Sequence, residues 1–274
     1  MKNLIVRALS GIIYVGVILG CFFAGYHWFA ALVIVLACLA YEESTSISIG
    51  PIKWRNVLVP YLDILSLVAV ILAFAETISP WWAVTMILVR CVAQLFVKDE
   101  HPTRRLTISF FQIFYLGTGL GTMLALSEAG KAVLAVLFFI WLNDTGAFVV
   151  GSLIGRHKLC QQISPKKTWE GFVGGLLFCV VFAVISYFYL NDWFAFLPYT
   201  NIWQWIAVAL TSALFATWGD LLESMFKRNL NIKDSGKIIP GHGGILDRID
   251  SPCRMVSVIL PLCLIAVFFG QAAL

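Results

Sequence analysis

A polar segment at residues 224–252 concentrates groups that can bind phosphate or a metal ion. It reads SMFKRNLNIKDSGKIIPGHGGILDRIDSP and holds five basic residues, three aspartates, one histidine and a glycine-rich turn. The stretches on both sides are apolar enough to span a bilayer, where ionisable groups are rare unless they serve a function. Clustered cations, closely spaced aspartates and a flexible turn together indicate a metal-bound phosphate compound handled at the membrane surface.

Two pairs of carboxylates have a spacing that suits metal binding. Asp247 and Asp250 are three residues apart, as are Asp220 and Glu223, so each pair shares one face of a helix. Mg²⁺ takes oxygen ligands, often one or two carboxylates together with substrate phosphates. We therefore expect Asp220 and Asp247, from adjacent spans, to form a metal site. Ordinary charges at salt-bridged helix ends are the alternative.

Asp144 lies inside an apolar stretch, in FIWLNDTGAFVVGS. A carboxylate at the centre of a bilayer costs about 2.5–3.5 kcal/mol on insertion scales, so it normally faces a cavity or a partner. The sequence favours a cavity-facing carboxylate over a hydrogen-bonding residue between two helices.

Two further segments could bind phosphate, although taken alone each is explained better without a ligand. In Pro240–Gly244, successive backbone N–H groups can form an anion-binding nest, with His242 as a hydrogen-bond donor rather than a metal ligand; a plain flexible turn is the alternative. In residues 164–171, Lys166 and Lys167 can hold a polyphosphate as point charges. Lysine and tryptophan are also common membrane-interface anchors, so anchoring stays open for this second segment.

The composition predicts that these groups are positioned by membrane-spanning helices. The 274 residues are 60% hydrophobic and 12% charged, whereas a soluble domain is about one quarter charged. We expect one domain over residues 1–274, an all-α polytopic integral membrane helical bundle of about nine transmembrane helices. Apolar stretches of spanning length lie at 4–24, 28–49, 57–76, 80–97, 107–127, 131–153, 171–190, 203–223 and 254–272.

The basic residues predict the orientation of this bundle, because cytoplasmic loops collect lysine and arginine. Seventeen of the 19 lie before or early in the first span or in alternate loops, leaving Lys131 opposite and Arg90 within a span. We expect the N-terminus and these loops to be cytoplasmic. The seventeen are Lys2, Arg7, Lys53, Arg55, Lys98, Arg104, Arg105, Arg156, Lys158, Lys166, Lys167, Lys227, Arg228, Lys233, Lys237, Arg248 and Arg254.

The polar segment resembles the signature of the phosphatidate cytidylyltransferase family, also called CDP-diacylglycerol synthases. The pattern is S-x-x-K-R-x₄-K-D-x-G-x₃-P-x-H-G-G-x-x-D-R-x-D. It is matched by Ser224, Lys227, Arg228, Lys233, Asp234, Gly236, Pro240, His242, Gly243, Gly244, Asp247, Arg248 and Asp250. Residues 144–147, 164–171 and 219–224 resemble the same family, which places the catalytic part at about 140–255. Phe148 and the pair Thr217-Trp218 depart from the family pattern, outside the proposed ligands.

The resemblance implies a reaction in phospholipid biosynthesis: CMP passes from CTP to phosphatidate, giving CDP-diacylglycerol and pyrophosphate, with Mg²⁺ and room for a second cation. It implies metal ligands at Asp220, Asp247 and Asp250, and a catalytic set of Asp220, Asp247, Asp144, Lys227 and Arg248. Substrate contacts are expected from Lys166, Lys167, Ser224, Arg228, Lys233, His242, Gly243 and Gly244.

Other functions remain open at this stage. A related CTP-dependent lipid kinase, or a cytidylyltransferase acting on an ether lipid, would also bind CTP, and an ion-coupled transporter would also place carboxylates in a helical bundle. We expect the lipid bilayer and the two substrates as partners, no nucleic acid, and leave a homodimer open. The chain length fits a bacterial enzyme of the cytoplasmic (inner) membrane, with its active site facing the cytoplasm.

Overall fold

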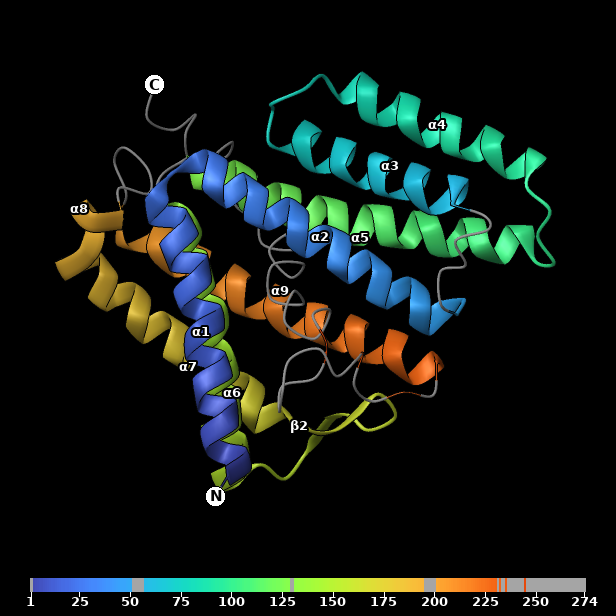
Figure 1. Cartoon of the computed structure of the whole chain (residues 1–274). Helices are drawn as coiled ribbons and strands as arrows, with labels where there is room; N and C mark the ends of the chain where they lie inside the picture. Colours follow the sequence, from blue (N-terminus) through green and yellow to red (C-terminus); the bar gives the residue numbers. More distant parts are fainter. Residues whose placement is uncertain are drawn as a thin grey trace. The chain divides into compact units, whose positions relative to one another are not determined.

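The computed structural model describes residues 2–50, 57–128, 131–194 and 201–230, together with the single residues 232, 235 and 244. Helices dominate these ranges (Figure 1). In chain order they are α1 (Lys2–Ala24), α2 (Tyr26–Ser48), α3 (Leu58–Phe74), α4 (Pro80–Phe96), α5 (Pro102–Glu128), α6 (Ala132–Ile154), α7 (Trp169–Ile185), the short π-helix η2 (Ser186–Leu190), α8 (Asn191–Phe194) and α9 (Ile202–Asn229).

Eight of the nine predicted spans coincide with described helices, and the ninth, 254–272, lies outside the described residues. Within the described residues, five helical stretches have the length and composition to cross a membrane: Tyr26–Ser48, Pro102–Ser127, Val133–Ile154, Trp169–Phe194 and Ile202–Asn229. The helices at Ile13–Ala24, Leu58–Phe74 and Pro80–Phe96 are apolar but shorter. A largely α-helical, polytopic membrane protein is therefore confirmed, whereas the number nine is not.

Two predicted boundaries differ from the structure for identifiable reasons. Helix α5 begins at Pro102 rather than 107, because proline is well suited to the first position of a helix. Helix α9 continues to Asn229 rather than ending at 223. Its last turn carries Lys227 and Arg228, which are polar but favourable at a helix C-terminus.

The helices cluster into two compact units, each described here by itself. The first comprises residues 1–128 and 230–249. In it, α5 packs against α2 and α3, and α3 packs against α4. Gly117 and Gly121 let α5 approach α3 closely, because a Cβ at Gly121 would lie 3.0 Å from the carbonyl oxygen of Ile71.

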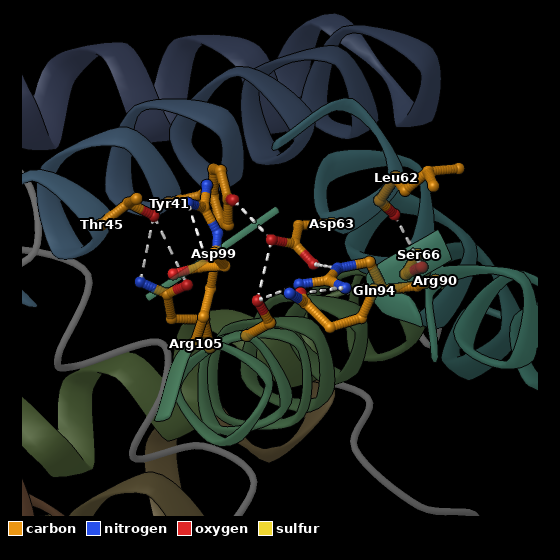
Figure 2. A network of polar contacts seen from close by, with 11 residues as sticks. Tyr41, Thr45, Leu62, Asp63, Ser66, Arg90, Gln94, Asp99 and Arg105 are labelled. Atoms are coloured by element: carbon orange, nitrogen blue, oxygen red, sulfur yellow. Dashed lines mark hydrogen bonds and ion pairs between the residues drawn. The ribbon is translucent and has the colours of Figure 1, made fainter. Parts of the chain in front are cut away.

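A buried polar network ties together four helices of the first unit (Figure 2). The carboxylate of Asp63 on α3 accepts hydrogen bonds from Tyr41 and Ser109, both at 2.8 Å, and forms an ion pair with Arg90 on α4. Arg90 also donates to Gln94 at 3.0 Å and to Ser109 at 3.1 Å. Arg90 and Asp63 are 0% and 1% exposed, so this charge pair is satisfied entirely inside the protein.

The second unit comprises residues 129–229 and 250–274. Helices α6 and α7 pack along each other, and α9 packs on both. Aromatic rings of Phe139, Phe182, Phe194 and Trp205 meet edge-on or tilted at centroid distances of 5.5–6.3 Å. This cluster fixes the end of the unit that contains α8.

One element of the second unit was not expected from the sequence. Strands β1 (Lys158–Cys160) and β2 (Ser164–Thr168) form an antiparallel hairpin between α6 and α7, with Lys158 opposite Thr168. The all-α prediction is therefore incomplete at this loop. The hairpin runs directly into α7 and presents the two lysines of the 164–171 segment.

Candidate active site

The β1–β2 hairpin is fixed to the start of α7 by local hydrogen bonds. Thr168 caps α7, because its hydroxyl oxygen accepts the backbone N–H of Gly171 at 3.2 Å, as expected for a threonine at this position. The carboxylate of Glu170 accepts the backbone N–H groups of Arg156 at 3.0 Å and His157 at 3.2 Å, and lies 2.6 Å from the His157 ring. Both ends of the hairpin are thereby tied to one helix turn.

A pocket of about 290 Å³ lies where this hairpin meets α6, α7 and α9. Its polar lining brings together groups from three elements. Asp144 and Asn143 come from α6, Lys166 and Lys167 from β2, and Thr217 from α9. The remaining walls are mainly small or apolar: Ala147, Phe148, Gly151, Ser152, Leu159, Thr168, Gly171 and Phe172.

The pocket exists because glycines allow α6 and α7 to approach each other. A Cβ at Gly171 would lie 2.7 Å from the carbonyl oxygen of Ala147, and a Cβ at Gly175 would overlap the side chain of Asn143. Asn143 is 1% exposed and donates to the Thr217 hydroxyl at 3.1 Å. This hydrogen bond links α6 to α9 beside Asp144.

The charged side chains that line the pocket are Asp144, Lys166 and Lys167. Lys167 forms an ion pair with Asp220 on α9, and both side chains are about one quarter exposed, at 27% and 23%. Lys166 is exposed at the pocket rim. The arrangement offers positive charge for an anionic ligand, with carboxylates from α6 and α9 beside it.

In the last turns of α9, other predicted site residues contact groups of the protein itself. Lys227 forms an ion pair with the buried Glu223 at 2.8 Å, and Arg228 donates to the backbone carbonyl of Ile163 in the hairpin at 3.5 Å. Ser224 is partly buried on the same helix. As far as the described residues go, the pocket lining includes none of Ser224, Lys227 and Arg228.

Several predicted residues fall outside the described part of the chain: Lys233, His242, Gly243, Asp247, Arg248 and Asp250. Gly244 is described and buried in the first unit, where it lies against Glu43 and Ser235. The proposed pairing of Asp220 with Asp247 in one metal site therefore stays a prediction.

The described donors suit a magnesium ion in chemistry, although they do not form a complete site by themselves. Among the described residues there is no cluster of three histidine, cysteine or acidic side chains close enough to hold a metal. The Asp220 carboxylate is a hard oxygen donor of the kind that Mg²⁺ prefers, and its ion pair with Lys167 shows that it attracts a cation in this position.

Sequence reasoning missed two contributors to the pocket. Thr217 and Phe148 were noted only as departures from a family pattern outside the proposed ligands, yet both line the pocket that contains Asp144. The signal that would have found Thr217 is its position three residues before Asp220, which puts both on one side of α9. Phe148 follows Asp144 by four residues in the same way.

Comparison with known proteins places this geometry in a family context. The model of the cytidylyltransferase family matches residues 5–266. A phosphatidate cytidylyltransferase of Staphylococcus haemolyticus (strain JCSC1435) is 32% identical over 255 residues, which cover 90% of this chain and 94% of the relative. Its counterpart in Staphylococcus epidermidis (strain ATCC 12228) is 31% identical over the same length. The one in Staphylococcus aureus (strain COL) is 47% identical over 125 residues, 46% of each chain.

Proposed function

Because this chain belongs to the cytidylyltransferase family, we propose that it transfers CMP from CTP to phosphatidate in the synthesis of membrane phospholipids. An oxygen of the phosphatidate phosphate attacks the α-phosphorus of CTP, and the bond between the α- and β-phosphates breaks. The products are CDP-diacylglycerol and pyrophosphate. The observation that carries the proposal is the family match over residues 5–266, together with relatives named phosphatidate cytidylyltransferase at 31–47% identity.

The pocket supports this reaction through its charges. Phosphoryl-group transfer depends mainly on positioning and on neutralising charge rather than on covalent help from the protein. Lys166 and Lys167 line the pocket on a hairpin whose two ends are tied to the start of α7, which supports a role for both lysines in binding the triphosphate. Phosphatidate is largely ionised at neutral pH, since the second pKa of a phosphate monoester is about 6. The attacking oxygen therefore needs no dedicated general base.

The carboxylates are assigned to the metal-dependent part of the reaction. We assign Asp220 to a Mg²⁺ ion, with Asp247 and Asp250 as further ligands and Asp144 lining the cavity. A bound Mg²⁺ would neutralise charge on the transferring phosphate and orient it. Lys167, released from Asp220 when that carboxylate takes a metal, would then be free to contact a phosphate oxygen.

The remaining assignments follow the family pattern. Ser224, Lys227, Arg228, Lys233, His242, Gly243 and Arg248 are proposed to contact the substrates, whereas Gly244, which lies against Glu43 and Ser235, is proposed to support that set without contacting a substrate. The protein is an integral membrane protein, and we propose that the hairpin side of the second unit faces the cytoplasm, where CTP is available. A homodimer and a second cation stay predictions.

Positionally labelled CTP tests the proposal and separates it from its nearest alternative. Purified protein is incubated with Mg²⁺, phosphatidate and CTP carrying ³²P at either the α- or the γ-position. Cytidylyl transfer puts the α-label into lipid and releases the γ-label as pyrophosphate. In a parallel assay with a lipid alcohol in place of phosphatidate, a lipid kinase would instead put the γ-label into lipid. An ether-linked phosphatidate analogue in the same assay tests the choice of lipid.

A further inference from the structure

Glu43, near the end of α2, buries its carboxylate against two residues of the polar segment. The hydroxyl of Ser235 donates to Oε1 of Glu43 at 3.2 Å, and the two residues are only 4% and 7% exposed. A Cβ built on Gly244 would overlap both the Glu43 carboxylate and the Ser235 hydroxyl. Positions 235 and 244, nine apart in sequence, therefore meet at a single carboxylate of the N-terminal half.

The helix that carries Glu43 is itself firmly anchored. On α2, Ser44 and Thr45 are buried and accept hydrogen bonds from the side-chain amide of Gln112 on α5, at 2.9 and 3.2 Å. Arg104 of α5 donates to the backbone carbonyl of Ser48 at 3.4 Å. These contacts fix the rotation of α2, so the position of Glu43 on its helix face does not depend on Ser235.

We propose that Glu43 is a positioning residue for the reaction, which holds Ser235 and Gly244 in register at the two ends of the glycine-rich part of the signature. This inference rests on the proposed function, which assigns that part of the signature to contacts with the substrates. Glu43 acts through Ser235 and Gly244 and is not assigned to the substrate. Position 244 lacks a side chain because the Glu43 carboxylate occupies that space.

A double-mutant cycle between positions 43 and 244 tests the proposal. In the native background, Gly244→Ala pushes the Glu43 carboxylate away from Ser235, and we expect kcat/KM for CTP to fall at least tenfold. Glu43→Ala removes the acceptor and also lowers kcat/KM at least tenfold. In the Glu43→Ala background the added methyl group has room, so Gly244→Ala should cost less than threefold more. Coupling of this size is expected only for residues in contact.

Conservative variants and controls separate positioning from general stability. Glu43→Gln keeps the side-chain volume and one acceptor oxygen, so it should retain most of the activity and the native KM for CTP. Glu42→Ala, at the exposed neighbouring position, and Gly20→Ala, where a Cβ meets nothing within 4 Å, should be silent. Glu43→Asp serves as the second background if Glu43→Ala fails to express.

The outcomes distinguish this inference from the proposed function. Additive effects of the two substitutions, or full activity of Glu43→Ala, would overturn the role of Glu43 while leaving the reaction intact. If the wild-type protein forms no CDP-diacylglycerol, the proposed function fails. The cycle is then measured by melting temperature in detergent, where non-additive shifts support the contact and additive shifts refute it.

Discussion

Lys167, which lines the pocket, forms an ion pair with Asp220 that joins the hairpin to α9. Both are partly exposed, so the pair adds little to folding, since exposed pairs contribute about 0–1 kcal/mol. Under the proposed function, each charge balances the other until a cation and an anionic substrate replace them. Because the pair contributes little to the free energy of folding, substituting either residue should affect activity more than stability.

Asp220→Asn should lower turnover by roughly a hundredfold or more while leaving expression and detergent monodispersity unchanged. Asparagine is nearly isosteric but carries no negative charge, so the metal would bind more weakly. Losing about 3 kcal/mol of transition-state stabilisation corresponds to about two decades in rate. Initial rates over a Mg²⁺ titration check this, with exposed Asp192→Asn on α8 as the silent control. More than about a tenth of wild-type turnover at saturating Mg²⁺, a loss of under one decade, would contradict the assignment.

Lys166→Gln and Lys167→Gln should each raise the KM for CTP severalfold with a smaller effect on kcat, because a point charge beside a triphosphate acts mainly on binding. Lys158→Gln is the matched control: it lies on the same hairpin, is exposed and is paired with Thr168 across the strands. Steady-state kinetics and membrane yield are measured together. An unchanged KM with reduced yield would identify the lysines as membrane anchors instead.

At the scale of elements, the network around Arg90 and Asp63 holds α2, α3, α4 and α5 together. Replacing Arg90 by methionine should destabilise the protein by about 3–5 kcal/mol, because it leaves the Asp63 carboxylate buried without its cation. Melting in detergent should show a large fall in melting temperature. Arg105→Met, which removes a partly exposed pair with Asp99 at 3.4 Å, is the control and should shift it little. Similar shifts for both variants would refute the structural role of the buried pair.

The elements were largely predictable from the sequence because the bilayer demands long apolar helices, a signal carried by about 20 residues at a time. Short polar features could not be predicted in this way. The hairpin of residues 158–168 is held by contacts of Glu170 and Thr168 that no hydropathy window detects. Asp63 and Arg90 are hidden among apolar neighbours, so only their pairing in space reveals them.

The candidate site was predicted in part, for a similar reason. Asp144, Lys166 and Lys167 stand out because they are charged in apolar or interfacial surroundings, and the structure brings all three to one pocket. Asn143, Thr217 and Glu43 gave weaker signals. Asn143 and Thr217 are uncharged, and Glu43 sits where an apolar stretch becomes polar, so their roles depend on packing between helices far apart in sequence.

For the whole molecule, the distribution of charge and the length of α9 together predict how the second unit is oriented in the bilayer. At about 1.5 Å per residue, the 28 residues of α9 extend about 42 Å, more than the hydrocarbon thickness of about 30 Å. Its C-terminal end carries Arg228, which contacts the hairpin at Ile163. Its N-terminal end follows Asn201. Gln162, in the hairpin beside Ile163, and Asn201, just before Ile202, therefore lie near opposite ends of α9.

Cysteine labelling in intact cells converts this geometry into a test of orientation. In a background without the seven native cysteines, Gln162→Cys should resist a membrane-impermeant thiol reagent, because the hairpin is predicted to be cytoplasmic. Asn201→Cys should react readily, and both should react after the cells are permeabilised, which shows that each thiol is accessible. The reverse labelling pattern would show that the protein has the opposite orientation, with the pocket out of reach of cytoplasmic CTP. Since the proposed reaction needs that nucleotide, this result would count against the function as well as the topology.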